Sequence, residues 1–192
     1  GICKAYDSGT EAWKKIPNLE LAGESADPTS PTASQAACRI FSTPLDVLEQ
    51  NEDLRREVFG PCSIIASGQS KEDILRYAAD LEGQLTAAIH GTEQDLADFA
   101  PLIRILERKV GRLIFNGFGT GIEVCPSMHH GGPYPAASHS FFTSIGTASI
   151  YRFVRPVCYQ GFPDSALPEP LKATNTRKAW RLIDGSFTQA DA

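Results

Sequence analysis

Four short apolar segments, separated by stretches with helical periodicity, constrain the fold of this chain more than any other feature. They lie at residues 37–41, 62–66, 85–89 and 112–116. Short apolar runs of this kind, bounded by polar residues, are typical of buried strands. Parallel strands are joined by long crossover connections, which are usually helical. The order of segments therefore predicts an α/β fold, with a mostly parallel sheet and helices on both faces.

Two of the intervening stretches carry helix-capping signals. Ser70 with Asp73, and Thr92 with Asp95, have the spacing of a capping box in which Asp stands in for the usual Glu or Gln. Each pair precedes apolar residues at helical spacing. The second stretch also contains Pro101, which predicts either a kink or the start of a new helix.

The remaining segments are less regular. Residues 1–15 have apolar positions at partly helical spacing and no clear N-cap, and the one methionine is Met128. We therefore expect a helix preceded by further protein, with a processed or engineered start of a complete protein as the alternative. Residues 18–36 indicate a loop, residues 44–54 a surface helix, and residues 179–185 a terminal strand and turn.

A long stretch rich in Gly and Pro follows the fourth strand segment, at residues 117–139. A short helix is expected after it, near residues 147–153. Loops longer than about 12 to 15 residues are uncommon in compact domains and usually functional. Ligands of open α/β sheets bind outside the carboxyl ends of strands, where this loop begins. We therefore expect the loop to border a ligand site, with a plain surface excursion as the alternative.

Composition and charge argue against several classes of function. The net charge is −5 and the pI is about 5.4, without a cluster of Lys and Arg, so neither nucleic acid nor an anionic membrane is an expected partner. The apolar runs are far shorter than the roughly 20 residues that cross a bilayer. Five scattered cysteines without a CxxC pair argue against disulfides and zinc, and predict free thiols in a reducing cytoplasm.

The pentapeptide at residues 57–61, Glu-Val-Phe-Gly-Pro, offers a carboxylate, an aromatic ring and a fixed turn in close succession. An ionised Glu57 can accept two hydrogen bonds from a vicinal diol such as a ribose. Phe59 can pack against a flat ring. This combination suits the nicotinamide riboside end of a dinucleotide. An ordinary helix-to-strand turn, with a solvated Glu and a core Phe, is the alternative.

The same pentapeptide resembles the E-x-F-G-P signature of the aldehyde dehydrogenase superfamily. The resemblance extends in family order over essentially the whole chain, through a strand ending in Asn-Gly at 116–117 and a loop ending in Gly-Gly at 131–132. The Gly-Gly-Pro-Tyr-Pro segment at 131–135 and the Trp-Arg-Leu-Ile-Asp-Gly tail at 180–185 are similar to the 2,5-dioxovalerate (α-ketoglutarate semialdehyde) dehydrogenase branch.

The resemblance implies an enzyme that oxidises an aldehyde to a carboxylic acid with NAD or NADP. In the family a cysteine thiolate attacks the aldehyde, hydride leaves for the cofactor, and water activated by a glutamate hydrolyses the thioester. The expected conversion is α-ketoglutarate semialdehyde to 2-oxoglutarate. Residues 1–178 would be the C-terminal part of the catalytic domain, and residues 179–192 a terminal strand and tail for assembly into a dimer or tetramer.

Site residues carry over from the family at a few positions. Glu57 matches the glutamate that binds the nicotinamide ribose, and Phe59 matches the aromatic that packs on the nicotinamide. Val124 and His130 fall at loop positions that line the aldehyde tunnel. No catalytic residue is expected in this chain, because the family's nucleophile and general base lie upstream of the matched region. Cys62 leads into a buried strand, where burial makes a thiol unreactive.

The chain also departs from the family pattern. Arg56 stands where relatives often carry a second acid, and His130 replaces a common Phe, which predicts a more polar tunnel suited to a dicarboxylic semialdehyde. His129 and His130 have no further ligand at metal-binding spacing, so no metal is expected. The alternative function is a non-catalytic binding or interaction module that retains the sheet.

Overall fold

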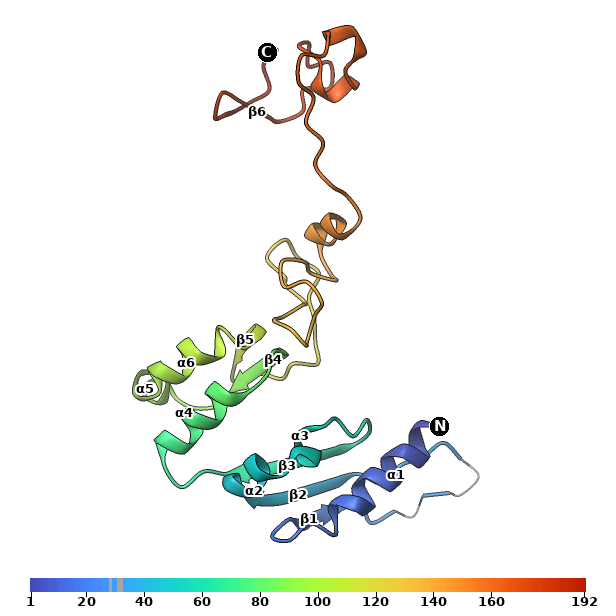
Figure 1. Cartoon of the computed structure of the whole chain (residues 1–192), viewed down its shortest axis with the longest axis vertical. Coiled ribbons are helices and arrows are strands. Elements are labelled where there is room, and N and C mark those ends of the chain that lie inside the picture. The colour runs from blue at the N-terminus through green and yellow to red at the C-terminus, as the bar shows by residue number, and fades with distance from the viewer. Residues whose placement is uncertain (28, 31–32) are drawn as a thin grey trace. The chain divides into compact units, whose positions relative to one another are not determined.

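The computed structural model describes residues 1–27, 29–30 and 33–192 and divides the chain into two compact units. The first unit, residues 1–149, contains helices α1–α6 and strands β1–β5, and the second, residues 150–192, contains strands β6 and β7 (Figure 1). No helix among the described residues is long and apolar enough to cross a membrane.

The first sheet is formed by β1 (Glu20–Glu24), β2 (Arg39–Pro44) and β3 (Cys62–Ser67), in that order. β2 and β3 are parallel and confirm two predicted strands, with β2 beginning slightly later than expected. β1 pairs antiparallel with β2 and lies in the segment predicted as a loop, 18–36. That prediction was wrong for β1 because pairing with β2, rather than local sequence, stabilises an edge strand that holds Ala and Gly. Residues 28 and 31–32 of the same segment lie outside the described residues.

The second sheet pairs β4 (Gln84–Ile89) with β5 (Val110–Phe115) in parallel. Helices α5 (Glu93–Asp98) and α6 (Ala100–Leu106) form the crossover between them, and α4 (Lys71–Asp80) joins β3 to β4. The α/β class and the parallel crossovers are therefore confirmed. The strands form two separate sheets, whereas a single sheet was expected. β3 and β4 share no ladder of hydrogen bonds in the part of the chain that the structure describes.

The predicted capping boxes are both present. The Ser70 hydroxyl accepts a hydrogen bond from the Asp73 N–H, and the Asp73 carboxylate accepts one from the Ser70 N–H; Thr92 and Asp95 repeat this arrangement. Hydrogen bonds from Arg76 and Ser70 lower the pKa of Asp73, and those from Thr92 lower the pKa of Asp95. The proline lies in the first turn of α6, so it starts a new helix rather than kinking one.

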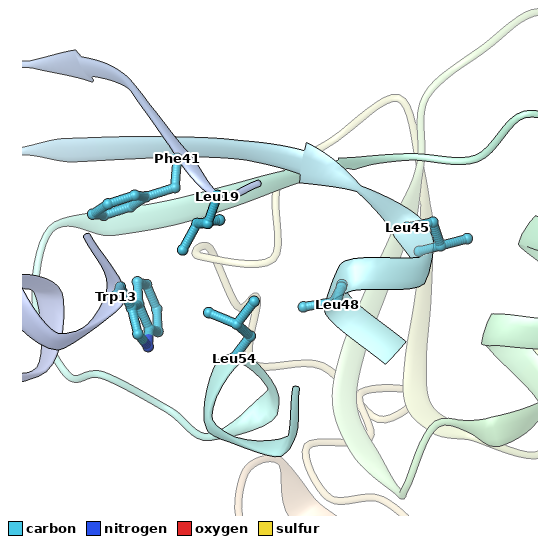
Figure 2. Packing of buried hydrophobic residues seen from close by; sticks show 6 residues of the cluster. All are labelled: Trp13, Leu19, Phe41, Leu45, Leu48 and Leu54. Atoms are coloured by element: carbon cyan, nitrogen blue, oxygen red, sulfur yellow. The ribbon is translucent and has the colours of Figure 1, made fainter. Parts of the chain in front are cut away.

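Helices α1 (Ile2–Trp13), α2 (Leu45–Gln50) and α3 (Glu52–Arg55) pack on one side of the first sheet. The single helix predicted over residues 44–54 is divided, because Asn51 has an extended backbone (φ −112°, ψ 99°). Figure 2 shows the resulting core, which consists of Trp13, Leu19, Phe41, Leu45, Leu48 and Leu54. At its centre the Trp13 and Phe41 rings meet edge to face, with their centroids 5.5 Å apart.

The opposite face of this sheet differs from the prediction of helices on both sides. Ile40 and Ile65 point away from the core, and 39% and 55% of their surfaces are exposed. Their neighbours Phe41 and Ile64 face the core, as expected for alternation along a strand. In the described residues, the first sheet therefore leaves an apolar face uncovered.

Arg39 joins α1 to the first sheet. Its side chain is largely buried, and its guanidinium forms ion pairs with Glu24 of β1 (2.6 Å) and with Glu11 of α1 (3.3 Å). It also donates a hydrogen bond to Thr10. Burial alone would lower the pKa of Arg39, but the hydrogen bond and charge of Glu24 and the charge of Glu11 outweigh it and raise the pKa. The positive charge is thus fixed between helix and strand.

The second unit ends in a hairpin of β6 (Arg181–Ile183) and β7 (Ser186–Thr188). Asp184 and Gly185 between them have positive φ angles of 51° and 79°, as a two-residue hairpin turn of type I′ requires. The predicted terminal strand and turn are confirmed, and β7 is an addition to that prediction. The buried Asn175 supports the hairpin by hydrogen bonding to the Ala179 and Gln189 carbonyls.

Replacing Phe41 by Ala should lower the free energy of unfolding by about 3 to 5 kcal/mol, because it removes a fully buried ring and leaves a cavity against Trp13. Urea titration of wild type and variant measures the difference. The control is Phe141→Ala, at a ring that is 94% exposed, which should stay within about 0.5 kcal/mol. Equal effects of the two substitutions would contradict this core.

Acidification should weaken α4 and α5 through their caps. Folding lowers the pKa of Asp73 and Asp95 below the ordinary value of 3.8, so their contribution is complete above that pH and is lost as the pH falls through the lower folded values. A double variant, Asp73→Asn with Asp95→Asn, should therefore show a flatter loss of helical circular dichroism below pH 4 than wild type. Asp27→Asn, at an exposed residue outside any helix, is the control.

Candidate functional site

The turn at residues 57–61 connects α3 to β3 and displays two of its side chains to solvent. Val58 is half-buried and packs against the hydrophobic core. Glu57 and Phe59, on either side of Val58 in the sequence, are exposed and line one cavity. Phe59 is 67% exposed, although it is a large apolar ring. The turn therefore presents a carboxylate and an aromatic ring on the same side.

Both side chains line a cavity of about 1170 Å³ in the first unit. Its wall includes Cys62 and Ile64 at the start of β3 and Tyr77 of α4. The second sheet contributes Gln84, Thr86, Ala87 and Val110. The predicted cofactor residues thus face an open space of ligand size, rather than a packed core.

The Glu57 carboxylate is free to bind a ligand. It has no hydrogen bond or ion pair with any residue that the structure describes, whereas the adjacent Arg56 is engaged with Glu52 (3.0 Å) and Asp53 (3.4 Å). A carboxylate without a partner retains its full capacity to accept hydrogen bonds, including two from neighbouring hydroxyls. The exposed ring of Phe59 supplies a flat apolar surface beside it. The cavity wall thus holds an unpartnered carboxylate and an exposed aromatic ring.

Backbone hydrogen bonds fix the end of the turn on β2 and β3. The Arg39 N–H donates to the Pro61 carbonyl (2.9 Å), and the Cys62 N–H donates to the Gly60 carbonyl (2.8 Å). The Cys62 thiol donates to the Val58 carbonyl at 3.5 Å. Burial, followed by the neighbouring Cys38 thiol, raises the pKa of Cys62. A protonated, hydrogen-bonded thiol at this place is a structural group and a poor nucleophile.

The long loop after β5 is anchored to both sheet strands. Asn116, with φ of 49°, exchanges two hydrogen bonds with the Gly91 backbone just beyond β4. The Arg112 guanidinium donates to the carbonyls of Gly119 (2.6 Å) and Gly121 (2.9 Å). The loop therefore starts at the carboxyl end of the second sheet, as predicted, and follows a defined path.

The later part of the loop returns to the amino ends of β4 and β5, where backbone meets backbone. A Cβ atom at Gly111 would lie 1.9 Å from the Gly131 carbonyl oxygen, and one at Gly132 would lie 2.5 Å from the Gln84 carbonyl oxygen. A Cβ atom at Gly83 would lie 2.2 Å from the Pro133 oxygen. Glycine is required at these positions because any side chain would occupy the space of another main chain.

The two predicted tunnel residues lie on this loop, away from the cavity lining. Val124 is 73% exposed. His130 is half-buried, and its N–H donates to the hydroxyl of the buried Thr143 (2.8 Å). Its Nδ1 atom is buried and has no hydrogen-bond partner among the described residues. The structure thus brings Glu57 and Phe59 together at one cavity, while Val124 and His130 are not part of its wall.

Comparison of sequences relates the chain to two enzymes over nearly its full length. It is 40% identical over 185 residues to alpha-ketoglutaric semialdehyde dehydrogenase 2 of Azospirillum brasilense, which covers 96% of this chain and 35% of that protein. It is 41% identical over 190 residues to alpha-ketoglutaric semialdehyde dehydrogenase of Acinetobacter baylyi, which covers 98% of this chain and 36% of that protein. The chain belongs to the aldehyde dehydrogenase superfamily. It spans about a third of the length of these relatives.

Solved structures of the aldehyde dehydrogenase superfamily share the fold. The Delta-pyrroline-5-carboxylate dehydrogenase of Mycobacterium tuberculosis matches 87% of this chain and 31% of its own, with a TM-score of 0.56 and 14% identity. The betaine aldehyde dehydrogenase of Staphylococcus aureus in complex with NAD+ matches 84% of this chain and 32% of its own, with a TM-score of 0.54 and 14% identity. No protein-family profile matches the sequence.

Other parts of the candidate site were not predicted from the sequence. The second sheet contributes Gln84 and Val110 to the cavity wall, and nothing in their local sequence indicates it. The contact between Gly111 and Gly131 also depends on how distant segments pack. The repeated glycines of the loop were the one visible signal, because glycine is frequent where two backbones approach closely.

Replacing Gly111 by Ala should displace the Gly131–Gly132 segment, since the new methyl group would overlap a backbone oxygen. We expect a loss of about 1 to 3 kcal/mol in stability and faster proteolysis within residues 126–140. Limited proteolysis with mass spectrometry measures the change. Gly121→Ala is the matched control, because a Cβ atom there meets nothing within 4 Å. Similar cleavage of both variants would argue against the backbone contact.

Proposed function

We propose that this chain forms the C-terminal part of the catalytic domain of an NAD(P)-dependent aldehyde dehydrogenase. The whole enzyme would oxidise α-ketoglutarate semialdehyde to 2-oxoglutarate through a cysteine thioester. Two relatives at 40% and 41% identity, both named for this substrate, support the proposal. The observation that carries it is the unpartnered Glu57 carboxylate beside the exposed Phe59 ring, at the wall of one cavity.

The role of this chain would be to bind and orient the cofactor. The Glu57 carboxylate accepts hydrogen bonds from the two ribose hydroxyls, and Phe59 packs against the nicotinamide. The dinucleotide, when bound, supplies the hydride acceptor of the oxidation. We propose NADP in preference to NAD. The residues that read the 2′ position of the adenosine ribose would lie outside this chain.

The chain would supply no nucleophile. Cys62 is the cysteine that lines the cavity, and its half-buried thiol has a raised pKa and donates to a carbonyl. Val124 and His130 would border the aldehyde once the remaining parts of the enzyme complete the tunnel. The imidazole of His130 would favour the carboxylate of a dicarboxylic semialdehyde.

The β6–β7 hairpin and the free thiols support proposals about assembly and location. We propose that residues 1–178 belong to the catalytic domain and that residues 179–192 contribute to a homo-oligomer. The β6–β7 hairpin is a short open-edged pair, on which Leu182 and Phe187 are 62% and 74% exposed. All five cysteines are free, which supports a reducing compartment such as the cytoplasm. Neither nucleic acid nor a membrane is a proposed partner.

Replacing Glu57 by Gln in the whole enzyme should raise the KM for the cofactor, because the hydrogen bonds would go to a neutral amide oxygen. A hydrogen bond to a charged group contributes about 1.5 to 3 kcal/mol, so the increase should reach about 10- to 150-fold for one bond. Steady-state kinetics with varied NADP measure it. Glu107→Gln, at an exposed residue outside the cavity lining, is the control. Unchanged cofactor kinetics in Glu57→Gln would remove its assigned role.

The whole enzyme should reduce NADP in the presence of α-ketoglutarate semialdehyde, and the isolated 192-residue chain should not. The reason is that the chain contains a cofactor-facing surface without a reactive thiol. Absorbance at the NADPH band, over a panel of aldehydes, tests both statements. No turnover of this semialdehyde by the whole enzyme would refute the proposed substrate. Aldehyde-dependent NADPH formation by the isolated chain would refute the proposal that this chain supplies no nucleophile.

A further inference from the structure

Helix α1 contacts the turn at residues 57–61 on both sides of Phe59. A Cβ atom at Gly9 would lie 3.0 Å from Val58 Cγ1, so the helix backbone and the Val58 side chain are in close contact. A Cβ atom at Gly60 would lie 2.2 Å from Cδ2 of Tyr6. The Tyr6 ring therefore lies directly against the Gly60 backbone. The contacts at Val58 and Gly60 flank Phe59 in the sequence.

Tyr6 is held by polar contacts of its hydroxyl as well as by packing of its ring. Its side chain is 1% exposed, and its hydroxyl donates to the Ala37 carbonyl at 2.5 Å. The same hydroxyl lies 3.3 Å from the Pro61 carbonyl oxygen, at the last residue of the turn. The Arg39 guanidinium lies 5.8 Å from the ring centroid. The ring thus joins α1, the start of β2 and the turn.

We infer that Tyr6 is a positioning residue for the nicotinamide-riboside site. It touches neither cofactor nor substrate, but it sets the path of the Gly60–Pro61 backbone and so the directions of Glu57 and Phe59. Gly60 is the matching half of this contact, because a methyl group there would overlap the Tyr6 ring. The inference rests on the proposed function and adds to it a residue from a helix that is distant in sequence.

The first test is Tyr6→Phe in the whole enzyme, which keeps the ring and removes the hydroxyl. Loss of a neutral hydrogen bond corresponds to about a 2- to 12-fold change in an equilibrium. We expect the KM for NADP to rise by such a factor while kcat stays within about twofold. Tyr151→Phe, at a tyrosine that is 63% exposed, should change neither constant.

A double-mutant cycle separates positioning from a general loss of stability. If Tyr6 acts through the turn that carries Glu57 and Phe59, the rise in KM for the variant Tyr6→Phe with Glu57→Gln should be smaller than the product of the two single rises. Multiplicative effects of the two substitutions, or a proportional loss of kcat and melting temperature, would overturn the positioning role. An unchanged KM in Tyr6→Phe would overturn it as well.

A second measurement does not depend on turnover. Hydrogen–deuterium exchange of a peptide covering residues 57–62 should be faster in Tyr6→Phe and in Gly60→Ala than in wild type, and unchanged in Tyr151→Phe. Equal exchange in all proteins would contradict the contact itself. Faster exchange in a protein that oxidises no aldehyde would instead refute the proposed function while leaving the effect of Tyr6 on the turn established.

Discussion

The attachment of helix α1 to strand β2 through Arg39 is the interaction on which the first unit depends. The guanidinium is largely removed from water and pairs with the carboxylates of Glu24 and Glu11, which are themselves 36% and 53% exposed. Ion pairs with exposed carboxylates contribute modestly to net stability, but the largely buried guanidinium would be costly to leave without partners. Arg39 therefore restricts α1 to one position on the sheet. That position brings Tyr6 and Gly9 against the turn at residues 57–61.

A rigid support of this sort matters because the functional groups themselves are exposed. Glu57 and Phe59 are largely exposed, so their orientation depends mainly on the backbone beneath them. Val58 faces inward to the core, and its two neighbours face the cavity. The chain thus offers a preorganised binding surface, for which little ordering is needed when a ligand arrives. In the proposed enzyme, such a surface would complement a reactive thiol contributed by another part of the protein.

Local features could be predicted from the sequence, and features that join distant segments could not. Ser70 with Asp73 and Thr92 with Asp95 specify their caps within four residues, so both helix starts were predicted correctly. The edge strand β1 was missed because its pairing with β2 creates it. In the site, the motif that carries Glu57 and Phe59 is local, and their family roles stay a prediction. The contact of Tyr6 with the turn could not be predicted from the sequence, because the two are more than fifty residues apart.

The contact of Gly111 with Gly131 limits how this protein can vary over evolutionary time. A side chain at Gly111 would overlap the Gly131 carbonyl oxygen, and one at Gly131 would meet the Phe142 carbonyl oxygen, so neither position can acquire a side chain without rerouting the loop. Val124, which lies between them in the sequence and is 73% exposed, carries no such restriction. Drift can therefore alter the chemistry that the loop displays while its course stays the same. If the loop borders the aldehyde as proposed, single replacements there would change the preferred substrate and leave the fold as before.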